Sequence, residues 1–277
     1  MTVSRHYGAL LLSAMLAMLF ILSLYIWKND KARDHDETIR KRFISMALCC
    51  LASPIFVMIF IKAFDPEEDC LVWLGLSPTG LVSALVLPLV LTATLFFGPI
   101  FDHLVFQRQQ YSMELPDMGN LRILRNYVVA PLAEELVFRV CICSLLVFGG
   151  WSKVFAGVVA PLMFGFAHLH HVLEHISAGH DFSRALQIAG FQTCYTTLFG
   201  MYAAFLFFRT GHLVSPFISH AFCNYMGLPE IGRLMRGKYR HILTVAYLAG
   251  IAGFITLLMP LTAPEWYSPR IWEFQLS

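Results

Sequence analysis

The chain has 277 residues, of which 57% are hydrophobic and only 14% are charged. A soluble domain carries about a quarter of its residues as charges, so this composition excludes a soluble globular protein and indicates one embedded in a lipid bilayer. The formal net charge of +2 provides no strongly basic surface, so we expect no nucleic-acid partner.

In chain order, eight apolar segments alternate with polar loops, and they predict membrane helices. They are 7–27, 43–61, 81–101, 126–148, 154–171, 185–208, 213–226 and 242–261. We therefore predict an all-α fold, a polytopic transmembrane helical bundle of about eight spans, in a single integral-membrane domain over 1–277. The first segment is expected to be a retained span, because no small-residue cleavage site follows it.

Prolines inside these segments predict that several helices are kinked or begin at the proline, because a proline removes a backbone hydrogen bond. The prolines are Pro54, Pro88, Pro99, Pro131, Pro161 and Pro216.

Lysine and arginine are unevenly distributed between the two sides of this predicted topology. Loops 28–42, 102–125, 172–184 and 227–241 carry 14 of them, and the opposite side carries five. Because cytoplasmic loops are enriched in these residues, we expect the first set to face the cytosol. Glu134, His168 and His220 then fall at a similar depth, which predicts a polar cavity open to the cytosol.

Two adjacent glutamates interrupt the fourth apolar segment. Glu134 and Glu135 lie near its middle, and Arg139 follows Glu135 by four residues. A charge at the centre of a membrane helix costs about 2.5–3.5 kcal/mol, so such groups are functional by default. The spacing predicts an ion pair between Glu135 and Arg139, which leaves Glu134 as the candidate general base. The alternative is a buried cluster that only ties helices together.

Three further polar side chains lie in later segments. His168 lies near the end of the fifth, and His220 and Asn224 are spaced i, i+4 in the seventh, so their side chains face the same way. Donors arranged in this manner can stabilise a developing oxyanion. Hydrogen bonding between helices is the alternative role.

A metal site and a cysteine nucleophile are weaker interpretations. His171, Glu174 and His175 match the HxxEH spacing of inverted zincins, but the match is short and lies where the span ends. Four further histidines follow His168, namely His170, His171, His175 and His180, and we assign none of them a catalytic role. Cys223 follows His220 by three residues, and this helical spacing does not create a thiolate.

Taken together, Glu134-Glu135-x-x-x-Arg139, Phe164-x-x-x-His168 and His220-x-x-x-Asn224 resemble a known set of motifs. The set is that of the type II CAAX prenyl proteases, the Ras-converting enzymes of the glutamate-dependent intramembrane protease family. The elements occur in the family's order, each on a predicted span. The similarity covers about 122–228, which we expect to form the catalytic core.

The resemblance implies an endopeptidase that removes the last three residues from farnesylated or geranylgeranylated CaaX proteins, such as Ras-like small GTPases. It implies that Glu134 and His168 activate a water molecule, and that His220 and Asn224 form the oxyanion hole. Glu135 and Arg139 would support the site, and neither a metal nor a cofactor is implied. The implied location is the endoplasmic reticulum membrane, with the active site facing the cytosol.

Other functions remain as alternatives to this one. A related family member could cleave a different peptide. A proton-coupled transporter could use Glu134, His168 and His220 as a relay, although transporters usually contain inverted repeats and none is visible here. A non-catalytic scaffold of the same fold would tolerate the loss of Glu134.

Overall fold

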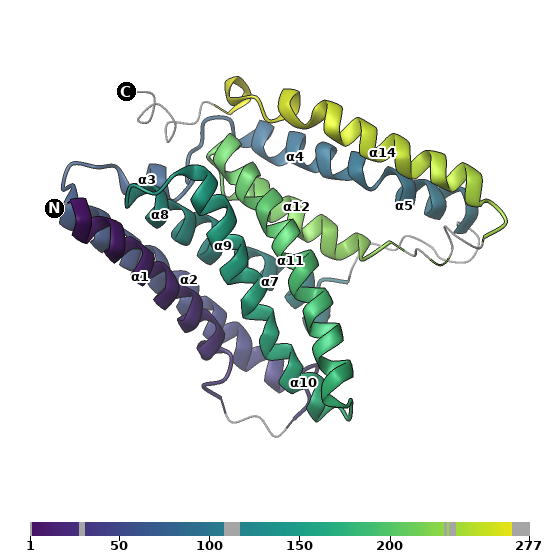
Figure 1. The fold of residues 1–277 in the computed structure, drawn as a ribbon, viewed down its shortest axis with the longest axis horizontal. Coiled ribbons are helices and arrows are strands. Elements are labelled where there is room, and N and C mark those ends of the chain that lie inside the picture. The colour runs from purple at the N-terminus through teal and green to yellow at the C-terminus, as the bar shows by residue number, and fades with distance from the viewer. Residues whose placement is uncertain (1, 28–30, 108–116, 230–231, 233–236, 268–277) are drawn as a thin grey trace.

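The computed structural model describes residues 2–27, 31–107, 117–229, 232 and 237–267, and every regular element in these ranges is a helix (Figure 1). The predicted all-α fold is confirmed. Helices α1 (Thr2–Ser23) and α2 (Asp36–Phe64) pack together, and α9 (Lys153–Ala167) lies between α1 and α11 (Phe182–Thr210).

A second group of helices lies along the other side of the molecule in Figure 1. Helix α14 (Arg240–Leu261) runs beside α4 (Leu81–Leu95) and α5 (Phe97–Asp102). Helix α12 (Val214–Met226) contacts α4 on one side and α11 on the other, so it connects the two groups. The short helix α3 (Cys70–Trp73) lies in the connection between α2 and α4.

All eight predicted segments are helical, but several helix ends differ from the prediction. Helix α2 begins at Asp36 rather than at residue 43, because His35 caps it by accepting a hydrogen bond from the backbone N–H of Glu37. The fifth segment leaves the α-helical conformation after Ala167. It continues as a 3₁₀ turn (His168–His170) and then as α10 (His171–Ser177).

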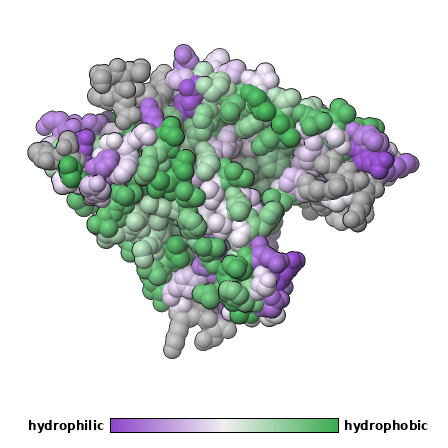
Figure 2. All heavy atoms as spheres, in the orientation of Figure 1, coloured by the Kyte–Doolittle hydropathy of each residue, from purple (hydrophilic) through white to green (hydrophobic). Residues whose placement is uncertain are grey.

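The outer surface is that of a membrane protein. Figure 2 shows hydrophobic side chains over broad areas, with hydrophilic ones gathered mainly at the ends. Leu11, Leu48, Val245 and Ile255 are among the large apolar side chains that lie exposed. Within the described ranges, four helices are long and apolar enough to cross a bilayer, and the α4–α5 pair makes a fifth if it is one bent span. The chain is thus a multi-pass membrane protein.

The third segment contains a sharp break close to a proline. The axis turns by 73° between α4 and the helix that begins at Phe97. The ring of Pro99 would clash with the carbonyl of Leu95, four residues earlier, and Pro99 has no N–H to continue the ladder. The bend therefore lies where the sequence predicts an interruption.

A continuous helical run from Leu121 to Phe148 forms the centre of the fold. It alternates between α-helical and π-helical turns: α6 (Leu121–Leu124), η2 (Arg125–Val129), α7 (Ala130–Glu134), η3 (Glu135–Cys143) and α8 (Ser144–Phe148). Pro131 would clash with the carbonyl of Tyr127 in a regular α-helix, and that carbonyl lies in the wider η2 turn. The second π-helix begins directly after Glu134.

Helices α9 and α11 approach closely because glycine is present at the contact. A Cβ added at Gly165 of α9 would overlap the hydroxyl of Thr197 and lie 3.1 Å from the carbonyl oxygen of Thr193. A Cβ added at Gly200 of α11 would lie 3.0 Å from both the Arg139 guanidinium and the Pro161 ring. This close approach holds α9 and α11 against the central run.

We expect Gly165→Ala to destabilise the protein by about 1–3 kcal/mol, because overpacking forces the two helices apart. The measurement is the Tm of the purified protein in detergent. Gly190→Ala is the matched control, since a Cβ added there meets nothing within 4 Å and alanine favours a helix. Equal Tm values for the two variants would contradict the proposed close packing.

Candidate functional site

The two adjacent glutamates occupy different environments. The Glu135 side chain is fully buried, and its Oε2 lies 3.1 Å from Nε of Arg139, which is also fully buried. The predicted i, i+4 ion pair is present. The Glu134 side chain is 18% exposed, and its nearest ionic partner is the imidazole of His220. Glu134 is therefore the freer carboxylate, as the spacing predicts.

Arg139 is held by aromatic rings as well as by Glu135. Its guanidinium carbon lies 4.2 Å from the centre of the Phe164 ring and 6.0 Å from that of Phe199, so cation–π attraction contributes. In the part of the chain that the structure describes, none of its three guanidinium nitrogens makes a hydrogen bond of good geometry. The charge is compensated by one carboxylate and two ring faces, and Gly200 leaves the space that it fills.

His220 connects the two glutamates. Its Nδ1 lies 2.7 Å from Oε1 of Glu135, and its Nε2 lies 3.7 Å from Oε2 of Glu134. Because a carboxylate only accepts hydrogen bonds, Nδ1 of His220 donates to Glu135. The ring packs against Phe199, at 4.7 Å between centroids, and against Phe164, at 6.4 Å. The second imidazole nitrogen of His220 therefore faces Glu134 in a fixed orientation.

His168 lies at the C-terminal end of α9, where the α-helix changes to a 3₁₀ turn. Its Nδ1 lies 2.8 Å from the carbonyl oxygen of Phe164, to which it donates, since the carbonyl can only accept. The Phe164 ring meets the His168 ring edge-on at 4.7 Å. This arrangement leaves Nε2 of His168 as the nitrogen that can exchange a proton with a bound molecule.

Glu134 and His168 line the same cavity. Its apolar wall is formed by Phe20, Ile21, Leu24, Met46, Ala130, Phe138, Phe164 and Ala167. Its polar lining includes three arginines, Arg33, Arg42 and Arg125, together with Asn126, His170 and His171. The structure therefore brings residues of α1, α2, the central run and α9 to one cavity.

Asn224 lies farther from these groups. Its side chain is exposed, and its amide nitrogen donates a hydrogen bond of 2.9 Å to the backbone oxygen of Asn126. Neither Asn224 nor His220 is among the described residues that line the cavity. Asn126 lines the cavity, so the hydrogen bond to Asn126 places the Asn224 amide next to a cavity residue.

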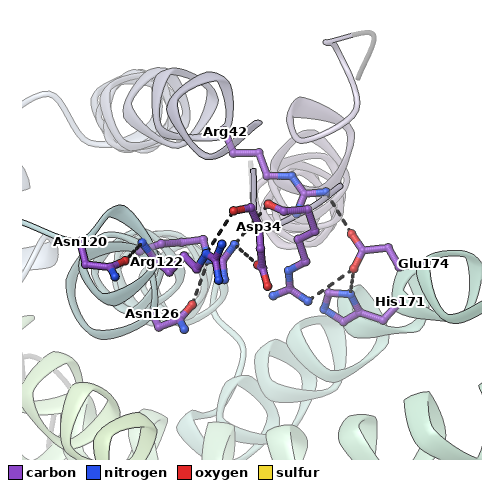
Figure 3. Close-up of polar contacts among 9 residues, drawn as sticks. Asp34, Arg42, Asn120, Arg122, Asn126, His171 and Glu174 are labelled. Atoms are coloured by element: carbon purple, nitrogen blue, oxygen red, sulfur yellow. Dashed lines mark hydrogen bonds and ion pairs between the residues drawn. The ribbon is translucent and has the colours of Figure 1, made fainter. Parts of the chain in front are cut away.

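The histidine-rich stretch does not assemble the HxxEH arrangement. Within the described ranges, the three groups close enough to share an ion are His170, His171 and Glu174, and His175 is not among them. Glu174 is already bonded to Arg42 at 3.0 Å and to His171 at 2.8 Å, as Figure 3 shows. A guanidinium beside this carboxylate opposes the binding of a cation.

The three cavity arginines were missed by the sequence reasoning, which counted them only as charges that orient the chain. Arg125 donates to Asp34 at 2.9 Å, and this bond lowers the pKa of the Asp34 carboxyl below its ordinary value. Arg33 lies 3.4 Å from Glu174, which also binds Arg42. No sequence spacing links these residues, because their segments meet only in the fold.

The fold and this site define a membrane-embedded protein with a glutamate–histidine centre beside an internal cavity. The family model described as type II CAAX prenyl endopeptidase, Rce1-like, matches residues 117–226. CAAX prenyl protease 2 of Homo sapiens is 38% identical over 91% of this chain and 80% of its own length. The protein of that name from Arabidopsis thaliana is 34% identical, over 91% and 89%.

A probable CAAX prenyl protease 2 of Schizosaccharomyces pombe is 31% identical over 88% of this chain and 90% of its own length. No solved structure matches the chain. The chain belongs to the type II CAAX prenyl endopeptidase family and is therefore a peptidase. The family resemblance drawn from the three motifs is confirmed.

We expect Arg139→Met to destabilise the protein by about 3–5 kcal/mol, because it leaves the buried Glu135 carboxylate without its cationic partner. The double variant Glu135→Gln, Arg139→Met should be more stable than Arg139→Met alone, since no charge is then left unpaired. The measurement is Tm in detergent, with the exposed Arg184→Met as control. A normal Tm with lost turnover would instead make Arg139 a catalytic residue.

Proposed function

We propose that this chain hydrolyses the peptide bond after the prenylated cysteine of CaaX proteins and releases the last three residues, using a water molecule activated by Glu134 and His168. One observation carries the mechanism. Of two adjacent carboxylates, Glu135 is held by Arg139 and His220, whereas Glu134 shares a cavity with the unbonded nitrogen of His168. A general base needs that freedom to accept a proton.

In this mechanism the water oxygen attacks the scissile carbonyl while its proton passes to Glu134. His168, fixed through Nδ1 by the Phe164 carbonyl, presents Nε2 as a second proton acceptor beside the same water. The tetrahedral intermediate collapses when the amine of the leaving tripeptide receives a proton from Glu134. One water is consumed, one peptide bond is broken, and no cofactor or metal takes part.

His220 and Asn224 are proposed to stabilise the oxyanion of that intermediate. Nδ1 of His220 is held by Glu135, so Nε2 is the nitrogen that this ring can present to the substrate. Asn224 uses one of its two amide hydrogens on Asn126, which leaves the other for the substrate. Both groups lie on α12, one helical turn apart.

The substrates in this proposal are farnesylated or geranylgeranylated CaaX proteins, such as Ras-like small GTPases. The apolar wall of the cavity suits a peptide that carries a lipid and the aliphatic side chains of the CaaX sequence. The lipid bilayer is the second partner, because a prenyl chain reaches the cavity from the membrane.

The proposed topology has eight spans, both termini on the side opposite to the cytosol, and a cavity open to the cytosol. The excess of lysine and arginine on one set of loops supports this orientation, and prenylated tails reside on that side. We place the protein in the endoplasmic reticulum membrane as a single domain over 1–277, with a catalytic core at about 122–228.

Glu134→Gln should lower turnover of a farnesylated CaaX peptide about 10²–10⁴-fold, because the amide keeps the shape of the side chain but cannot accept the proton. Binding of the peptide should largely persist. The measurements are release of the tripeptide by mass spectrometry and binding of an uncleavable analogue. Near wild-type cleavage by the folded variant would refute the mechanism.

Asn224→Ala should lower kcat about 10²–10³-fold with little change in KM, because an oxyanion donor acts on charge that appears only in the transition state. The double variant with His220→Ala should be little worse than His220→Ala alone, since groups acting as a unit are not additive. Tyr225→Phe on the same helix is the control. A pure KM effect at Asn224 would show that it binds substrate rather than the oxyanion.

A further inference from the structure

Three arginines line the cavity, and the two carboxylates that bind them lie outside its described lining. Arg33, Arg42 and Arg125 line the cavity, whereas Asp34 and Glu174, which bind them, are not among the described residues that do so. Figure 3 shows Arg42, Asp34 and Glu174 in this cluster, together with His171. Among the described carboxylates, only Asp34 and Glu174 bind these three arginines, and Glu134 lines the same cavity without an ion pair to any of them.

Arg42 has unused hydrogen-bonding capacity in a partly buried position. Its side chain is only 12% exposed, and one of its five N–H donors binds Glu174 at 3.0 Å. Its Nε is buried and has no hydrogen-bond partner among the described residues. Glu174 is shared with Arg33, at 3.4 Å, and with His171, so it cannot saturate both guanidiniums. A partly buried guanidinium with a free donor suits an anionic ligand.

The distance between this cluster and Glu134 fits a short peptide. Arg125 precedes Glu134 by nine residues on the central helical run. An α-helical rise of about 1.5 Å per residue would separate their Cα atoms by roughly 13 Å along the axis, and the π-helical turn at Arg125–Val129 shortens this distance. Three fully extended residues span about 10–11 Å. An arginine side chain covers the remainder, so a carboxylate three residues beyond the reacting carbonyl would reach the guanidiniums.

We propose that Arg33, Arg42 and Arg125 bind the C-terminal carboxylate of the substrate and so fix the length of the released peptide at three residues. These arginines are specificity-determining residues, and none of them touches the reacting atoms. The inference rests on the proposed peptidase function, since it needs a substrate whose free C-terminus enters this cavity. A phosphate of a lipid headgroup would be a different occupant of the same donors.

The test compares two farnesylated CaaX peptides that differ only in a C-terminal carboxylate or carboxamide, assayed in a non-ionic detergent without phospholipid. For the wild-type protein, the amide should have a kcat/KM about 10- to 100-fold lower, mainly through KM, because a charge-assisted hydrogen bond is lost. A peptide with one extra residue displaces the carboxylate by about 3.3–3.6 Å and should be cleaved about as poorly as the amide.

Arg42→Gln should reduce kcat/KM for the acid to near that for the amide, so that the ratio between them approaches one. Arg33→Gln, at a side chain that is 49% exposed, should also reduce the ratio, and it carries the test if Arg42→Gln fails to fold. Lys41→Gln is the control. It removes a neighbouring charge that pairs with Glu37 at 2.8 Å and is not among the described cavity residues, so the ratio should be retained.

Equal cleavage of acid and amide by the wild-type protein would overturn the carboxylate site and leave the peptidase function intact. Retention of the full ratio in both arginine variants would also overturn it. If the ratio persists but the variants lose activity only when anionic phospholipid is added, the arginines bind a lipid phosphate instead. Failure of the wild-type protein to cleave either peptide would refute the proposed function itself.

Discussion

The ion pair between Glu135 and Arg139 is the interaction on which the rest of the site depends. Both side chains are fully buried, so each would cost several kcal/mol if it were left without compensation. Compensation comes from separate elements: Phe164 on α9, Phe199 on α11 and His220 on α12. Two of these helices also position candidate site residues, since His168 directly follows α9 and His220 lies on α12. The contacts that compensate this buried pair therefore also fix the positions of the candidate site residues.

Much of the fold is predictable because its causes are local in sequence. A run of some twenty apolar residues has to form a helix in a bilayer, since no water is present to satisfy its backbone. The pairing of Glu135 rather than Glu134 with Arg139 follows from their spacing alone. The interruption before Pro99 likewise has a local steric cause. The π-helix η3, which begins after Glu134, has no comparable local signal, whereas η2 lies where Pro131 interrupts the α-helical ladder.

The cavity is less predictable because it forms between segments that are distant in sequence. The approach of His220 to both glutamates depends on the contact between α12 and the central run, whereas the motif supplies only the residue types. The bond from Asn224 to the carbonyl of Asn126 crosses 98 residues and leaves no trace in the spacing of either. In the sequence, Arg33 and Arg42 are charges of a polar loop. Their proximity to Glu174 of α10 arises only in the folded chain.

The two adjacent glutamates also show how one membrane helix can hold two carboxylates in different environments. Consecutive side chains diverge around a helix, so one faces the packed interior and the other the cavity. Glu135 fixes its neighbours through Arg139 and His220, and it therefore cannot change its bonding without loosening three helices. Within the described residues, Glu134 forms no ion pair with an arginine, and its side chain is 18% exposed. The structural carboxylate provides the rigidity that allows the adjacent one to remain chemically free.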